Sequence, residues 1–169
     1  MVIILLANGF EEVEALAPLD IMLRADIPVK TASIGDITVM GAHGIKVVAD
    51  MLAEDIKEEE IEMLVLPGGM PGTTNLDLSP YTQKFIDATV KNSGHIAAIC
   101  AAPSILGKRG LLRGKKAICF PGFEDSLEGA TVCYGMSVVT DGSFTTAKDF
   151  RAAYGFGDEL TEIYKTMRD

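Results

Sequence analysis

Three short runs of apolar residues, at positions 2–7, 63–66 and 96–99, constrain the fold of this chain most. None of them alternates with polar residues, so each predicts a strand that is buried on both faces. Helical stretches are expected at 11–25, 81–91, 101–108 and 152–167. Alternating helices and buried strands predict an α/β fold, a doubly wound and mostly parallel sheet sandwiched by helices.

Shorter segments complete this prediction. A strand is expected at 29–34, a short antiparallel pair at 38–40 and 45–48, and further β segments at 131–133 and 137–140 before the Asp141-Gly142 turn. A chain of 169 residues is long enough for one domain, which we expect to span residues 1–169.

Composition excludes several classes of partner. The chain has 15 basic and 24 acidic residues, a net charge of -9 and no basic cluster, so a nucleic-acid partner is not expected. No apolar run approaches the ~20 residues that span a bilayer, and the first residues lack a basic leader, so we expect a cytoplasmic protein without membrane contact. Three cysteines without C-x-x-C spacing and two histidines without i, i+4 spacing predict no disulfide framework, no metal site and no cofactor.

Cys100 is the strongest candidate for a functional side chain. It lies between the buried strand at 96–99 and the helix expected at 101–108, as in a nucleophile elbow. Free N–H groups and the positive end of a helix dipole favour a thiolate over a thiol there, so we expect a low-pKa, reactive cysteine. The alternative is a small buried apolar side chain, which is the interpretation that we favour for Cys119 and Cys133.

The loops at 8–12 and 67–72 should meet Cys100, because ligands bind at the carboxyl edge of a parallel sheet. A carboxyl group buried beside a thiolate would stay protonated and donate a hydrogen bond to sulfur, but periodicity alone does not choose among Glu11, Glu12 and Glu14. Carboxylates in the first turn of a helix also stabilise it without any further role.

A glycine pair and the two histidines are the other candidates for hydrogen-bond donors or bases at this edge. The pair Gly68-Gly69 is either a tight turn or, together with the Ala101 N–H, part of an anion pocket, and the two interpretations are compatible. His95 precedes a buried strand and should lie at the opposite edge of the sheet, and His43 falls in the Gly-rich antiparallel pair. No Cys-His dyad is visible, which disfavours a peptidase.

Four motifs occur in order along nearly the whole chain: ANGFEEVE at 7–14, LPGG at 66–69, AAICAAP at 97–103 and FPGFE at 120–124. Together they resemble the ThiJ/PfpI superfamily, and specifically its DJ-1 branch. The resemblance implies a flavodoxin-like, class I glutamine amidotransferase-like sandwich and a homodimer. It also implies a reactive Cys100, a protonated Glu14 and N–H groups of Gly69 and Ala101 around the sulfur. We add Gly68 to this anion pocket, and we expect His43 and Arg24 to contribute from its surroundings or at a dimer contact.

The chain departs from the family pattern at several positions. Phe120 stands where several relatives have a histidine near the cysteine, His43 replaces an arginine, and Ala102 replaces a glycine. The segment 149–151, Asp-Phe-Arg, replaces Gly-Pro-Gly and is expected to reshape the rim of the site. These changes disfavour proton transfer by imidazole and weaken an assignment as a glyoxalase or deglycase.

Three functions therefore stay open. The first is a cysteine-dependent oxidative-stress response protein whose Cys100 thiolate is oxidised to a sulfinate. The second is an enzyme of the glyoxalase or deglycase type, in which Cys100 adds to methylglyoxal or acts on its adducts. The third is a chaperone-like dimeric module that needs no thiol. The expected partners are a second copy of the chain and a small oxidant or reactive carbonyl.

Overall fold

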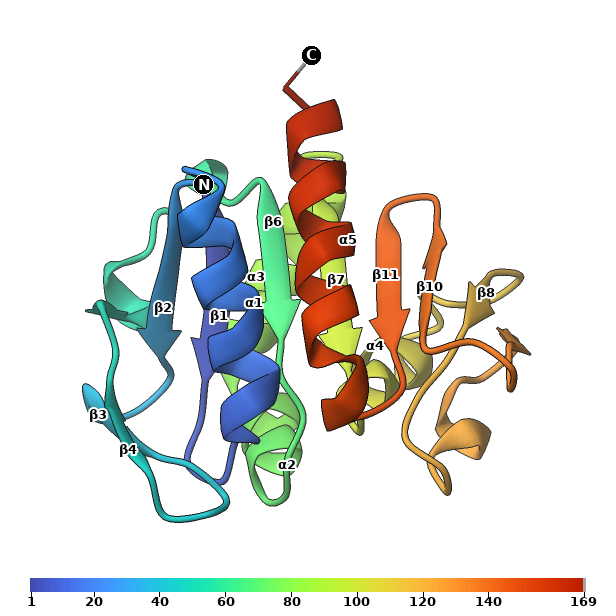
Figure 1. Ribbon diagram of the computed structural model, residues 1–169, viewed down its shortest axis with the longest axis horizontal. Coiled ribbons are helices and arrows are strands. Elements are labelled where there is room, and N and C mark those ends of the chain that lie inside the picture. Colours follow the sequence, from blue (N-terminus) through green and yellow to red (C-terminus); the bar gives the residue numbers. More distant parts are fainter. Residues whose placement is uncertain (169) are drawn as a thin grey trace.

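The computed structural model describes residues 1–168 and shows a three-layer sandwich of helices, sheet and helices (Figure 1). The central sheet has seven strands in the order β10-β11-β7-β6-β1-β2-β5. Neighbours in it run parallel, except that β10 and β11 form an antiparallel hairpin. The strands are β1 (Val2–Leu6), β2 (Val29–Ser33), β5 (Met51–Leu52), β6 (Met63–Leu66), β7 (His95–Ile99), β10 (Val138–Asp141) and β11 (Phe144–Ala147).

Helices cover both faces of this sheet. One face carries α1 (Glu12–Arg24) and α5 (Ala153–Thr166), and the other carries α2 (Gly72–Leu78), α3 (Pro80–Lys91) and α4 (Pro103–Lys108) (Figure 1). Alternate residues of β1 enter the two cores: Ile4 belongs to the α1 and α5 side, and Ile3 to the other. Both are fully buried, and burial of one such side chain contributes roughly 1.5–3 kcal/mol. The predicted doubly wound, flavodoxin-like fold is confirmed.

The smaller elements lie outside the large sheet. β3 (Thr38–Met40) and β4 (Lys46–Val48) form the predicted antiparallel pair, whereas β8 (Lys116–Ala117) and β9 (Thr131–Val132) pair in parallel. Single turns of 3-10 helix occur at Ala53–Asp55, Glu58–Glu60, Glu124–Ser126 and Phe150–Ala152. No helix within residues 1–168 is both long enough and apolar enough to cross a bilayer.

Several details differ from the prediction. β5, β8, β11 and α2 were not among the predicted elements; β5 and α2 have two and seven residues and no clear periodicity of their own. The helix after Cys100 begins at Pro103 rather than at 101, because residues 101 and 102 form a turn before it. Ser79 precedes α3, and its side chain makes no capping hydrogen bond.

The topology places three loops at one edge of the sheet. The chain runs from β1 outward to β2 and β5, and then returns to form β6 on the other side of β1. The strand order therefore reverses between β1 and β6, which is the usual ligand-binding position in open α/β sheets. The loop after β1, the loop after β6 and Cys100 after β7 all leave the carboxyl ends of neighbouring strands there.

Candidate functional site

Cys100 is held by its backbone in a conformation that non-glycine residues rarely adopt. Its φ angle is 64°, in the left-handed region, and such a residue persists only where its surroundings hold it. The Cys100 N–H donates to the carbonyl of Ala147 at 2.9 Å, and its own carbonyl accepts from the N–H of Phe120 at 2.8 Å. These bonds turn the half-buried side chain away from the path of β7 and toward the loops after β1 and β6.

Glu14 supplies the carboxyl group next to the thiol. It lies in the first turn of α1, is 1% exposed, and its Oε2 accepts from the N–H of Gly68 at 3.0 Å. Its Oε1 is buried without a hydrogen-bond partner among residues 1–168, and the Cys100 Cβ lies close to the same carboxyl, since a Cβ at Gly68 would touch both. Burial raises the pKa of Glu14 to about 7. A carboxyl that keeps its proton can donate it to sulfur, which would satisfy this oxygen.

Gly68 and Gly69 bring the backbone close to both groups. A Cβ at Gly68 would lie 2.5 Å from both the Cys100 Cβ and the Glu14 Oε2, so only glycine fits between them. Gly69 has a φ of 90°, which also favours glycine. The N–H groups of Gly69 and Ala101 oppose the rise in the pKa of Cys100 that burial causes, so both lie near its sulfur. The structure thus brings together all five residues that the sequence analysis assigned to the thiol and its anion pocket.

The Cys100 thiol and the Glu14 carboxyl influence each other's protonation. Burial raises the pKa of Cys100 to about 12, the negative charge of Glu14 adds to this effect, and the N–H groups of Gly69 and Ala101 oppose it. The helix expected next to the sulfur, α4, begins three residues later and has six residues. A thiolate at Cys100 is favoured when Glu14 is protonated, because two adjacent buried anions repel each other, and the low-pKa thiolate stays a prediction.

The remaining candidates lie outside the contacts of the thiol. His95 is buried at the amino end of β7, at the opposite edge of the sheet as predicted, where its Nε2 lies 2.9 Å from the Thr145 Oγ1. Burial lowers the pKa of His95 to about 4. Arg24 lies at the far end of α1, exposed and paired with Asp20. It is ten residues from Glu14, or about 15 Å along a helix, so Arg24 lies away from the thiol of its own chain, and its contribution at a dimer contact stays a prediction.

The other two cysteines have different surroundings. Cys119 is 1% exposed in the core on the α3 and α4 side, and burial raises the pKa of its thiol to about 12. Cys133 is partly exposed, and its Sγ lies 3.7 Å from the Thr131 carbonyl. Among residues 1–168, neither of these sulfurs has the combination of a buried carboxyl and two N–H groups that surrounds Cys100.

Two of the positions that depart from the family pattern, Phe120 and the 149–151 segment, lie close to Cys100 along the backbone hydrogen bonds. Phe120 is exposed, and its backbone N–H donates to the Cys100 carbonyl. An aromatic ring therefore occupies the position at which the family resemblance led us to look for a histidine. The charge of Asp149 raises the pKa of Glu14 beyond the effect of burial, and the 149–151 segment follows Ala147, whose carbonyl accepts from the Cys100 N–H. Ala147 was not predicted to belong to the site; its carbonyl accepts the hydrogen bond of the Cys100 N–H. No local signal could reveal it, because an alanine carbonyl has no distinguishing side chain.

Comparisons with known proteins agree with this arrangement. The model of the DJ-1/PfpI family matches residues 1–163. Protein DJ-1 homolog B of Arabidopsis thaliana is 34% identical over 163 residues, which are 95% of this chain and 37% of the plant protein. A deglycase of Pyrococcus horikoshii is 30% identical over 97% of this chain and 99% of its own length.

Solved structures show the same similarity in three dimensions. Oxidized DJ-1 of Toxoplasma gondii superimposes with a TM-score of 0.88 at 30% identity, covering 96% of this chain and 89% of that one. The chain spans little more than a third of the Arabidopsis relative but nearly all of the Pyrococcus one. A family match over residues 1–163, together with the shared fold, shows that this chain belongs to the DJ-1/PfpI family.

Proposed function

We propose that the chain is a cysteine-dependent oxidative-stress response protein of the DJ-1 type, in which peroxide oxidises Cys100. One observation carries this proposal: the sulfur faces the Glu14 carboxyl and the N–H groups of Gly69 and Ala101, and neither histidine of the chain lies there. These groups favour a sulfur that carries oxygen atoms, because N–H groups and a protonated carboxyl are donors and sulfinate oxygens are acceptors. The similar Toxoplasma structure is of an oxidized protein.

The proposed chemistry uses both members of the Cys100 and Glu14 pair. The thiolate sulfur attacks one peroxide oxygen, an S–O bond forms, the O–O bond breaks, and Glu14 gives its proton to the leaving hydroxide to make water. The product is a sulfenic acid. A second peroxide adds another oxygen in the same way and yields the sulfinate, whose oxygens are placed to accept from the N–H groups of Gly69 and Ala101.

Mild peroxide followed by mass spectrometry tests this proposal. We expect oxygen to add to Cys100 before Cys119, which is buried, and before Cys133, which lacks the donors. Glu14→Leu should slow sulfinate formation about tenfold or more, because it removes the proton donor. Cys133→Ser serves as the matched control and should leave the rate at Cys100 unchanged. First oxidation at Cys119 or Cys133, or an unaltered rate in Glu14→Leu, would contradict the proposal.

A glyoxalase or deglycase activity is the second candidate, favoured by the Pyrococcus relative, which is named a deglycase and matches over nearly its whole length. Here the thiolate would add to the aldehyde carbon of methylglyoxal, a C–S bond would form, and the carbonyl oxygen would take the Glu14 proton to give a hemithioacetal. This candidate predicts methylglyoxal consumption by the wild type and none by Cys100→Ser. Equal turnover in the two proteins would remove it, and protection of a client protein by Cys100→Ser would favour a chaperone-like module.

We further propose that two copies of the chain associate. Exposed apolar side chains occur on α1 and on the β3–β4 pair, among them Leu23, Met40, Ile45 and Val48. Exposed apolar residues of this kind are available to be covered by another protein. Sedimentation velocity should give about twice the 18.0 kDa chain mass, and a sedimentation coefficient of a monomer at all concentrations would refute the association.

A further inference from the structure

A cavity of about 380 Å³ lies at the edge of the sheet opposite to Cys100. It is formed by the amino end of β7, the turn between β10 and β11, and the carboxyl-terminal half of α5, which covers this part of the sheet (Figure 1). Its lining includes an imidazole, two carboxylates and two apolar side chains, at His95, Glu159, Glu162, Ile163 and Met167. No lysine or arginine of residues 1–168 lines it. The cavity is therefore rich in hydrogen-bond acceptors and in negative charge.

Three hydrogen bonds connect the Glu159 carboxylate to the His95 imidazole. The Thr140 hydroxyl donates to the Glu159 Oε1 at 2.7 Å, and the hydroxyl oxygens of Thr140 and Thr145 lie 2.8 Å apart. The Thr145 Oγ1 in turn lies 2.9 Å from the His95 Nε2. Thr145 is 0% exposed and His95 is 4% exposed, so protein encloses the inner end of this hydrogen-bond series.

The hydrogen-bond series has one possible order of donors, and this order fixes the tautomer of His95. A carboxylate oxygen only accepts, so Thr140 gives its single hydroxyl proton to Glu159. Thr140 then accepts from Thr145, which uses the single proton of that hydroxyl, and the His95 Nε2 therefore donates to Thr145. Burial lowers the pKa of His95 to about 4, so the ring is neutral near neutral pH. Its other nitrogen, Nδ1, consequently has a lone pair and no proton.

The His95 Nδ1 is an acceptor that opens to the cavity. It has no hydrogen-bond partner among residues 1–168, although the ring as a whole is buried. The enclosed side-chain atoms of these residues that lack a partner belong to Glu14, Thr73 and Thr82, so the Nδ1 is not sealed and faces the cavity that the ring lines. Polar groups of buried side chains nearly always have a partner, so this atom points to a donor bound in the cavity.

The charges around the cavity select the kind of donor. Glu159 accepts from Thr140 and has no ion-pair partner in the part of the chain that the structure describes. Glu162 pairs with Lys165 at 2.9 Å, but both side chains are exposed, and such surface pairs stabilise little. Two carboxylates beside an acceptor nitrogen favour a cation with N–H groups, because hydrogen bonds between charged partners are the strong ones. The apolar side chains of Ile163 and Met167 suit a short alkyl chain.

We propose that this cavity binds a small primary amine in its alkylammonium form, whose N–H groups donate to the His95 Nδ1 and to the Glu159 carboxylate. The alkyl chain of the ligand packs on Ile163 and Met167. This second site is independent of the chemistry at Cys100, because the two lie at opposite edges of the sheet.

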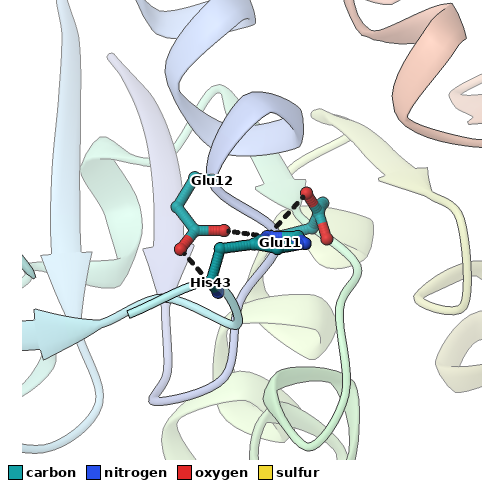
Figure 2. A group of neighbouring side chains, drawn as sticks. All are labelled: Glu11, Glu12 and His43. Carbon is teal, nitrogen blue, oxygen red and sulfur yellow. Dashed lines mark hydrogen bonds and ion pairs between the residues drawn. The ribbon is translucent and has the colours of Figure 1, made fainter. Parts of the chain in front are cut away.

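The tautomer of His95 is the first measurement. The chain has two histidines, so long-range ¹H–¹⁵N spectra of labelled protein report each ring separately. Figure 2 shows the other imidazole, that of His43, with its Nδ1 2.8 Å from the Glu12 Oε2, which accepts. We expect a proton at Nδ1 in His43 but only at Nε2 in His95, and His43→Asn identifies the His43 signals by removing them. A proton on the His95 Nδ1 near neutral pH would overturn the inference.

Titration with n-butylammonium chloride, followed through the His95 Nδ1 signal at constant ionic strength, measures binding. Alkylamines are protonated at about pH 7.5, as lysine is. We expect the shift to saturate with a dissociation constant of about 1–10 mM. Butyltrimethylammonium keeps the charge and the chain but has no N–H, and 1-butanol keeps a donor and the chain but has no charge. Each should bind about tenfold more weakly or less. Equal binding of either control would overturn the ligand class, and no saturation with butylammonium would overturn the site.

Three substitutions separate the hydrogen-bond series from the charge. Thr145→Val keeps the shape of threonine without its hydroxyl, so the His95 Nε2 loses its acceptor, and we expect butylammonium to bind about fivefold more weakly or less. Thr145→Ser restores the hydroxyl and should restore the affinity. Glu159→Gln can still accept from Thr140 but has no charge, and should weaken binding about tenfold. Unchanged affinity in both Thr145→Val and Glu159→Gln would overturn the inference. Cys100→Ser should bind as the wild type does, so the outcome is separate from that of the proposed oxidation.

Discussion

Gly68→Ala is expected to slow the oxidation of Cys100 by about two orders of magnitude, because displacing a reacting group by about 1 Å costs about that much. The added Cβ would lie 2.5 Å from the Cys100 Cβ, 2.5 Å from the Glu14 Oε2 and 2.9 Å from the Ile99 carbonyl. Two of these atoms belong to the backbone or begin a side chain, so they cannot rotate away. The sulfur and the carboxyl must separate, which removes the proton donor from the thiol. Sulfinate formation at fixed peroxide, followed by mass spectrometry, measures the loss.

Gly35→Ala is the matched control for this substitution. Gly35 also follows a strand, β2, at the same edge of the sheet, but it is exposed and a Cβ there would meet no atom within 4 Å. It should react at the wild-type rate. Circular dichroism and a thermal melt of both variants distinguish a distorted site from an unfolded chain, since overpacking costs about 1–3 kcal/mol of stability by itself. A folded Gly68→Ala that oxidises at the wild-type rate would show that the close contact is unimportant.

Phe156→Ala should have the largest effect on stability, lowering the free energy of unfolding by about 3–5 kcal/mol. Phe156 lies in the first turn of α5, is 0% exposed, and belongs to the core between α1, α5 and the sheet. Its neighbour Gly157 packs against Pro18 and Ile21 of α1, which leaves the two helices little room to close a cavity. Because α5 covers this face of the sheet together with α1, the cavity lies in the main core (Figure 1). Urea unfolding monitored by circular dichroism measures the change.

Tyr154→Ala provides the comparison on the same helix. Tyr154 is 66% exposed, so its removal should change stability by less than about 0.5 kcal/mol. The difference between the two variants isolates burial, since both replace an aromatic residue of α5 by alanine. A Phe156→Ala loss as small as that of Tyr154→Ala would mean that the core on this side relaxes freely around the missing ring.

The fold was predictable because three of its strands are short apolar runs bounded by turn residues, which indicate strands buried on both faces. The apolar runs of β1, β6 and β7 lack alternation, and the structure buries them completely between two helical layers. β5 escaped prediction because two residues are too short for any periodicity. The start of α4 was misplaced because residues 101 and 102 have helical composition but are held in a turn, where Ala102 donates to the Ile99 carbonyl.

The position of the site was predictable from the sequence, but the surroundings of its side chains were not. Composition could not choose among Glu11, Glu12 and Glu14, because successive residues of a helix start project in different directions. In the folded chain the Glu14 carboxyl contacts Gly68, whereas the Glu12 carboxyl contacts the turn at His43. The raised pKa of Cys100 depends on burial and on the distance to Glu14, both of which arise from packing between distant segments. Association of two chains stays a prediction.

The elbow at Cys100 is built almost entirely from main-chain atoms. The carbonyl of Ala147 and the N–H of Phe120 fix its backbone, and the N–H groups of Gly69 and Ala101 approach its sulfur. Main-chain groups are the same whatever side chain is attached, so the exposed rings of Phe120 and Phe150 can be exchanged without removing these contacts. A combinatorial library at these two positions would therefore vary which molecules reach the sulfur while the nucleophile itself stays constant.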